Sequence, residues 1–231
     1  MKNVWEENIY SKNKQLNKYP YGELVSVFYN SLKYIRKSNL KILELGCGAG
    51  NNLWFFAELG HKVFGIDGSI SAVKHARMTL DSRGVYADVR LGYFDNLPYE
   101  DSSMDIVIDR ESIYASLIED INLYLLEVSR VLKPGGIFIT FRFSENDPNL
   151  KLLLSGKIKG NKIEKNTWSS VSDGPFAETG IVHFSSYEEM LLQHDFLEIK
   201  YLNEHNSLPV LNNYTEVGYP YCEYILMGVK K

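Results

Sequence analysis

Between residues 40 and 143, short apolar segments alternate with segments that have helical periodicity. The apolar segments predict strands at 41–45, 62–66, 85–91, 104–109 and 136–143. The intervening segments predict helices at 51–59, 70–83 and 118–132. This alternation predicts a parallel sheet with helices on both faces. Ligands of such sheets bind outside the carboxyl ends of the strands, which places a functional site there.

The flanking segments extend this pattern. Apolar residues recur at helical spacing from Gly22 to Lys37, and a further helix is predicted from Ser186 to His194. Residues 197–204 and 222–229 predict two more strands, joined by a connector at 206–220. The expected fold is α/β, a three-layer α/β/α arrangement with a mostly parallel seven-stranded sheet that ends in an antiparallel hairpin strand.

The segment from Ser144 to Gly180 departs from the alternation. It contains the polar stretches SGKIKGNK and SSVSDG with only scattered apolar residues. It is long for a plain connection, so it is either a mobile lid or a small inserted subdomain. A variable surface loop is the simpler alternative.

Composition narrows the classes of protein. Hydrophobic residues make up 45% of the 231 residues, enough for a sizeable core, and the net charge of −4 includes no concentrated basic stretch that favours nucleic acid. Two cysteines, Cys47 and Cys222, fit a reducing compartment and are too few for a structural zinc site. The first residues lack the apolar core of a signal peptide, and no apolar run is long enough for a membrane span. We therefore expect a cytoplasmic protein, monomeric or homodimeric, without a metal.

The sequence ILELGCGAGNN joins the first predicted strand to a helix, with glycines at 46, 48 and 50. Glycine permits tight backbone angles and removes side chains that would block a ligand, and a helix amino end offers free N–H groups. A dinucleotide site usually reads G-x-G-x-x-G. Here the third glycine comes one residue early, and Asn51 holds its place.

Four motifs in order resemble the class I S-adenosylmethionine-dependent methyltransferases. They are LELGCGAG, GIDGS, NLPYEDSSMDIVID and EVSRVLKPGGIF, and together they cover about residues 40–143. The amino-terminal QLNKYPYGELV is also similar to a bacterial subgroup of small-molecule methyltransferases, whose first segment folds over the cofactor. The resemblance implies one methyltransferase domain over 1–231. Its expected parts are a helical segment at 1–39, a cofactor-binding core at 40–143, a lid or insertion at 144–183, and a last helix and two strands at 184–231.

The resemblance implies S-adenosylmethionine as the cofactor. Asp67 ends the second strand, where the family's acid holds both ribose hydroxyls by charge-assisted hydrogen bonds. Glu44 and Asp109 are expected near the cofactor's amino group. The remaining implied cofactor residues are Gly46, Cys47, Gly48, Gly50, Asn51, Asn52, Gly68 and Ser69.

The adenine pocket departs from the family pattern. The family places an acidic residue after the third strand, and this chain has Tyr93 there, followed by Phe94 and Asp95. We expect Tyr93 or Phe94 to provide a backbone N–H and an aromatic wall. Asp95 is the alternative partner of the adenine amino group.

The acceptor is expected to be a small molecule. DRES at 109–112 differs from the Asp/Asn-Pro-Pro-aromatic signature of enzymes that methylate amino groups of DNA bases and glutamine. Arg110 and Glu111 lie at the mouth of the predicted site and, with His183, are the catalytic candidates. Glu111, His183 and His205 are candidate bases, although an amine or a thiolate needs none.

Two other functions stay open at this level. A non-catalytic cofactor-binding module would have the same glycine loop and Asp67. A nicotinamide-dependent oxidoreductase would share the sheet, although Asn51 stands where its fingerprint needs glycine.

Overall fold

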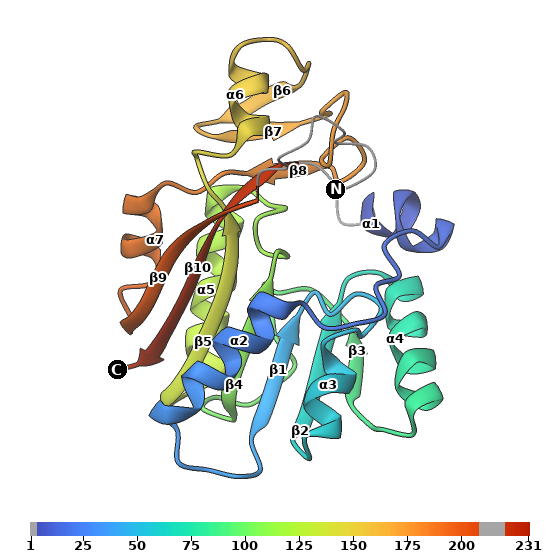
Figure 1. Ribbon diagram of the computed structural model, residues 1–231, viewed down its shortest axis with the longest axis vertical. Coiled ribbons are helices and arrows are strands. Elements are labelled where there is room, and N and C mark those ends of the chain that lie inside the picture. Colours follow the sequence, from blue (N-terminus) through green and yellow to red (C-terminus); the bar gives the residue numbers. More distant parts are fainter. Residues whose placement is uncertain (1–3, 208–219) are drawn as a thin grey trace.

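The computed structural model describes residues 4–207 and 220–231. A seven-stranded sheet runs through the molecule in the order β3-β2-β1-β4-β5-β10-β9 (Figure 1). The strands are β1 Lys41–Leu45, β2 Lys62–Asp67, β3 Asp88–Leu91, β4 Met104–Arg110, β5 Leu132–Phe143, β9 Leu197–Ser207 and β10 Tyr221–Lys230. The first five strands pair in parallel, and β10 is antiparallel to both β5 and β9. The predicted mostly parallel sheet is confirmed.

Helices cover both faces of this sheet. They are α2 Gly22–Ser31, α3 Leu53–Glu58, α4 Ile70–Arg83, α5 Ile118–Val131 and α7 Tyr187–Gln193. Because side chains alternate along a strand, Ile42 of β1 packs in a core beneath α2, α3 and α4. Its neighbour Leu43 packs in a second core beneath α5 and α7. The result is the predicted three-layer arrangement.

Local sequence signals set several helix ends. The Ser69 hydroxyl accepts from the Ala72 N–H and caps the start of α4. Ser186 and Glu189 form a capping box on α7. The predicted strand at 136 instead begins at Leu132, because Leu132 pairs with Met104 of β4 and the KPGG residues form an irregularity before pairing resumes at Ile137.

The last two strands form the predicted antiparallel hairpin at one edge of the sheet. The last strand, β10, inserts between β5 and β9, so β9 forms the edge of the sheet. This register places Glu223 of β10 opposite Phe143 on one side and His205 on the other. Most of the predicted connector at 206–220 lies outside the described residues.

The segment after β5 has secondary structure of its own. It contains α6 Pro148–Leu154 and a three-stranded antiparallel sheet of β6 Asn161–Glu164, β7 Thr167–Ser169 and β8 Ile181–His183. Trp168, Phe176 and Phe184 of this segment pack in an apolar cluster that also includes Phe143 at the end of β5. Figure 1 shows this small sheet beyond the carboxyl ends of the parallel strands. The segment is therefore an ordered unit with its own helix and sheet, and its part as a lid or an insertion stays a prediction.

The amino-terminal segment contains two short helical elements within the region expected to be helical. The short helix α1 Val4–Asn8 and the 3₁₀ turn Tyr10–Lys12 lie against α4. Glu6 accepts hydrogen bonds from the hydroxyls of Ser69 and Ser71, which fastens this segment to the start of α4. Within the described ranges, no helix combines the length and the apolar character that a membrane crossing requires.

Candidate active site

A cavity of about 530 Å³ lies at the carboxyl ends of the parallel strands. The glycine loop after β1, the ends of β2 and β4, the amino-terminal segment and the small-sheet subdomain all contribute to its wall. This is the position that the order of elements predicts for a ligand in an open α/β sheet.

The glycine loop makes close approaches possible. Gly46 has φ +62°, and a Cβ there would lie 2.1 Å from the Ser112 hydroxyl oxygen. A Cβ at Gly48, which has φ +51°, would lie 2.5 Å from the Tyr10 hydroxyl oxygen. Side chains at these positions would therefore collide with the β4 turn and with the amino-terminal segment, and the backbone angles already favour glycine.

Gly50 has a different part in the loop. A Cβ at Gly50 would lie 3.1 Å from the backbone and side chain of Ala76 in α4. The described residues that line the cavity include Gly46, Cys47 and Gly48 but not Gly50. The third glycine thus permits contact between the loop and α4.

Glu44 is buried next to the loop with half of its carboxylate unpaired. Oε1 accepts a hydrogen bond from Asn52 Nδ2 at 2.6 Å, and Oε2 has no partner in the part of the chain that the structure describes. Burial, only partly offset by the Asn52 bond, raises the pKa of Glu44 to about 8. A cationic ligand group near Oε2 would satisfy this oxygen and favour the ionised carboxylate.

Asn51 and Asn52 link the loop to the amino-terminal segment. Asn51 Nδ2 donates to the Tyr19 carbonyl at 3.0 Å, and the Tyr21 N–H donates to Asn52 Oδ1 at 3.2 Å. Both asparagines also line the cavity. The side chains of Asn51 and Asn52, at the start of the predicted helix, therefore hold the amino-terminal segment against the cavity.

Asp67 ends β2 and faces the loop. Its carboxylate accepts from the N–H groups of Gly48 and Ser69, each at 2.9 Å. Burial raises the pKa of Asp67 to about 6, with these two bonds acting in the opposite direction. At neutral pH the group is mostly ionised and can accept further hydrogen bonds from a ligand. Burial, together with the Asp67 charge, raises the pKa of Tyr10.

Aromatic side chains form the wall beyond Asp67. A Cβ on Gly68 would lie 2.9 Å from the Tyr93 ring, so the absence of a side chain brings this ring close to the backbone. Phe94 packs edge-on against Tyr124 at 5.4 Å between ring centroids. Tyr93, Phe94 and Asp95 all line the cavity, and their contact with adenine stays a prediction.

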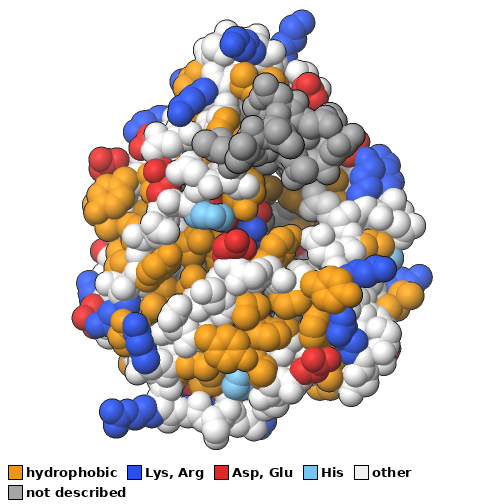
Figure 2. Space-filling model, in the orientation of Figure 1, with side chains coloured by type: hydrophobic (Ala, Val, Ile, Leu, Met, Phe, Trp, Pro, Cys, Tyr) orange, Lys and Arg blue, Asp and Glu red, His pale blue; other side chains and the backbone are white. Residues whose placement is uncertain are grey.

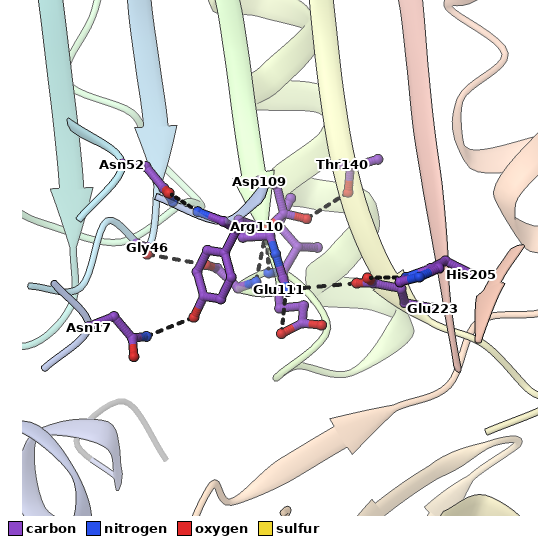
Figure 3. A network of polar contacts seen from close by, with 12 residues as sticks. Asn17, Gly46, Asn52, Asp109, Arg110, Glu111, Thr140, His205 and Glu223 are labelled. Carbon is purple, nitrogen blue, oxygen red and sulfur yellow. Dashed lines mark hydrogen bonds and ion pairs between the residues drawn. The ribbon is translucent and has the colours of Figure 1, made fainter. Parts of the chain in front are cut away.

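A charged cluster occupies the end of β4 (Figure 3). The Arg110 guanidinium lies between the rings of Tyr21 and Phe141, 4.2 and 4.9 Å from their centroids. It forms an ion pair with Glu111 and lies 3.8 Å from Glu223. Glu111 has φ +53°, an uncommon backbone conformation for a residue other than glycine. Arg110 and Glu111 both line the cavity.

Two predicted site residues are directed elsewhere. The Asp109 carboxylate accepts from the N–H groups of Ser112 and Ile113 and from the Thr140 hydroxyl, so it shapes the turn after β4. His183 is buried, with Nδ1 2.7 Å from the Thr167 hydroxyl. Neither side chain is among the described residues that line the cavity. A catalytic part for His183 thus has no support in its placement, because its ring packs between β7 and α7.

The far end of the cavity is aromatic. Tyr114 and Phe143 pack edge-to-face at 4.7 Å, and Phe143 and Phe176 do so at 4.9 Å. The sequence prediction missed the cavity residues Trp5, Tyr10, Gln15, Asn17, Tyr21, Phe143, Phe176, Thr179 and Ile181. The sequence placed Gln15, Asn17 and Tyr21 in a segment expected over the cofactor, and Phe143 at the end of the fifth strand, without assigning their side chains to the site. The other residues belong to segments outside the motifs.

A family model described as "Methyltransferase domain" matches residues 36–182, well over half of the chain. The chain belongs to the methyltransferase-domain family. Membership implies S-adenosylmethionine as the cofactor, and the glycine loop, the unpaired Glu44 oxygen and the Asp67 carboxylate fit such a cation bearing a sugar.

Relatives in the methyltransferase family share the central part of the chain. A "Probable S-adenosylmethionine-dependent methyltransferase" of Mycolicibacterium smegmatis is 33% identical over 113 residues, 49% of this chain and 41% of the relative. A "Ubiquinone biosynthesis O-methyltransferase" of Maricaulis maris is 29% identical over 118 residues, 51% of this chain and 46% of the relative. The matched stretch thus spans less than half of these relatives.

The fold has a close counterpart among solved structures. An S-adenosylmethionine-dependent methyltransferase of Methanosarcina mazei superimposes with a TM-score of 0.72 at 21% identity, covering 92% of this chain and 98% of that chain. This similarity confirms the class I methyltransferase fold.

Proposed function

We propose that this protein transfers the methyl group of S-adenosylmethionine to a small-molecule acceptor. One observation carries the proposal: a single cavity joins the glycine loop and Asp67 to Glu111 and an aromatic end wall. The part of the cavity proposed for the cofactor, the cofactor half, is therefore continuous with the part proposed for the acceptor, the acceptor half. We also propose that the protein is a single domain and that it acts in the cytoplasm.

The cofactor is proposed to lie along the glycine loop. Asp67 would accept from the ribose hydroxyls, and the unpaired Glu44 Oε2 would pair with the amino group. Tyr93 and Phe94 would border the adenine. The acidic side chains of this wall suit a ligand that carries positive charge, because opposite charges stabilise each other in a partly buried site.

The acceptor is proposed to be small and at least partly aromatic. Tyr114, Phe143 and Phe176 give the far end of the cavity an apolar surface, and aromatic rings pack favourably edge-to-face against such walls. Lys and Arg side chains on the face in Figure 2 are scattered among acidic and uncharged ones. On that described face there is no continuous basic patch of the kind that binds nucleic acid.

The cofactor supplies the electrophilic methyl group by its own chemistry. The chain's residues orient the acceptor, exclude water and manage its proton. Phe176, Ile181 and the amino-terminal Trp5 would close the cavity around the acceptor. Positioning of two reactants in this way is worth about 7–11 kcal/mol in the best cases. Glu111 is the ionisable side chain we propose to face the acceptor.

A tritium-transfer assay tests the function. The protein is incubated with methyl-tritiated S-adenosylmethionine and a panel of phenols, catechols, amines and thiols, and the Gly46→Val variant serves as the inactive control. Label is expected in a small hydroxylated aromatic acceptor, a chemistry also favoured by the O-methyltransferase name of the relative. Tight cofactor binding without transfer to any acceptor class would instead favour the non-catalytic module.

A further inference from the structure

Glu223 is a buried carboxylate that the sequence motifs do not explain. It lies on β10 with 0% exposure, opposite His205 in the neighbouring strand. Its Oε1 is 3.4 Å from His205 Nδ1, and the ion-pair distance from Oε2 to Arg110 Nη1 is 3.8 Å. Oε2 forms no hydrogen bond with any residue for which a position is described. Figure 3 shows these side chains beside the end of β4.

Glu111 connects this buried carboxylate to the cavity. Glu111 lines the cavity and forms an ion pair with Arg110, whose Nη1 also lies 3.8 Å from Glu223 Oε2. The two carboxyls therefore flank one guanidinium, with Glu111 on the cavity side. Two ionised carboxylates can only accept hydrogen bonds, so a hydrogen bond between them requires a shared proton.

The charges around the pair favour retention of one proton. Arg110 is the cation beside both carboxyls, so it balances only one negative charge. Burial raises the pKa of Glu223 to about 8, Arg110 opposes this, and Glu111 adds to it. The other ionisable groups that face the pair are Glu23 of α2, His205 of β9, and Tyr21, Tyr114, Asp147 and Tyr221.

We propose that Glu111 and Glu223 form a proton-sharing pair that takes up the proton lost by the methyl acceptor. The inference rests on the proposed methyl transfer. In that step a bond forms between the acceptor atom and the methyl carbon, and the S–CH₃ bond breaks with its electron pair left on sulfur. The acceptor's proton passes to Glu111 and is held between Glu111 and Glu223.

The pair responds to the charge of the cofactor. S-adenosylmethionine carries a positive sulfonium that its product, S-adenosylhomocysteine, lacks. A nearby positive charge favours two ionised carboxylates, and loss of that charge favours the protonated pair. Binding of the next S-adenosylmethionine would thus return the proton to solvent. Glu223 touches His205, whose side chain is 35% exposed beside a surface groove of about 290 Å³.

Calorimetry with these two ligands tests the proposal without an acceptor. Titrations at pH 8 in two buffers of different ionisation enthalpy give the number of protons released on binding. S-adenosylmethionine is expected to release about 0.5 to 1 proton more than S-adenosylhomocysteine. Glu44 meets the same amino group in both ligands, so the difference between the ligands reports on the sulfonium.

Variants assign this difference to the pair. Glu223→Gln and Glu111→Gln should each remove it while both ligands still bind. Glu198→Gln, an acid of β9 that is paired with Lys200 at the surface, should retain it. A difference of zero in the wild type, or a full difference in Glu223→Gln, would overturn the proposal.

The wild type gives a second test that needs no folded variant. The difference between the ligands should be largest near pH 8 and vanish at pH 5.5, where the pair remains protonated with either ligand. A difference independent of pH would exclude the pair as its source. If neither ligand binds, the proposed function fails, whereas equal proton counts with both ligands bound defeat this inference alone.

Discussion

The two halves of the cavity are built in different ways. The proposed cofactor half consists mainly of backbone and short side chains, with Asp67 and the glycine loop held by hydrogen bonds of 2.8 to 3.2 Å. The proposed acceptor half consists of large aromatic side chains from separate segments, such as Phe143 and Phe176. Contacts between main-chain groups tolerate little change, whereas a wall of side chains can vary in shape. This contrast suits a common cofactor and an acceptor specific to each protein.

The largest effect is expected in the acceptor half. Phe176→Ala should lower the free energy of unfolding of the small-sheet subdomain by about 3–5 kcal/mol, because it removes a ring from that subdomain's own cluster. Hydrogen exchange should quicken at the amides of β7 and β8 and stay unchanged in β1. Leu154→Ala, at a side chain that is 60% exposed, is the control with little effect. Equal loss of protection in β1 would show that the two halves unfold together.

Asp67→Ala tests the cofactor half. The change removes an acceptor for the ligand and leaves the Gly48 and Ser69 N–H groups without their partner. The affinity for S-adenosylhomocysteine should fall about 30- to 1000-fold, equivalent to about 2–4 kcal/mol. Calorimetry measures this directly, with Asp88→Ala on the adjacent strand as the control. A loss below threefold would remove Asp67 from the proposed site.

The pH dependence of cofactor affinity depends on Glu44. Its pKa of about 8 means that the carboxyl is largely neutral at pH 6, and only the ionised form pairs with an ammonium group. Affinity for S-adenosylhomocysteine should therefore rise with pH from 6 to 8, by at most about tenfold per unit. Glu44→Gln should flatten this profile. A profile that is the same in the variant would assign the dependence to another group.

The raised pKa of Glu44 also bears on stability. A folded-state pKa above the unfolded value of 4.5 means that the folded protein binds the proton more tightly. The contribution to stability is thus fully present below pH 4.5 and is lost as pH rises through about 8. Denaturant unfolding of the ligand-free wild type and Glu44→Gln should diverge over this range.

The smallest effect is expected where the amino-terminal segment joins the cofactor half. Glu6 accepts from the Ser71 N–H at 3.0 Å and from the Ser71 hydroxyl at 2.7 Å, in addition to its bond from Ser69. Glu6→Gln should weaken this attachment and speed dissociation of S-adenosylhomocysteine about three- to tenfold. Stopped-flow fluorescence gives the rate, with the exposed Glu7→Gln as the control. An unchanged rate would mean that the segment does not limit release.

The sequence alone determined the central fold and the position of the cavity. Strand and helix periodicity are local properties, and Gly46, Gly48 and Asp67 lie within a few residues of strand ends that their own neighbours specify. The Ser69 cap could be predicted for the same reason, since it needs a partner only three residues away. Membership in the methyltransferase family agrees with what these motifs indicated.

Only the tertiary structure decided which distant residues complete the cavity. Tyr10 meets Gly48 and Glu223 meets Arg110 because the amino-terminal segment folds back and β10 inserts beside β5. Glu223 is the single acidic residue within the apolar strand CEYILMGV, which indicates that it is buried. The residues that it contacts, however, depend on sheet order and register. These are set by the pairing of β10 with β5, whose partner residues lie 80 to 92 positions apart in the sequence, and no local periodicity records such a pairing.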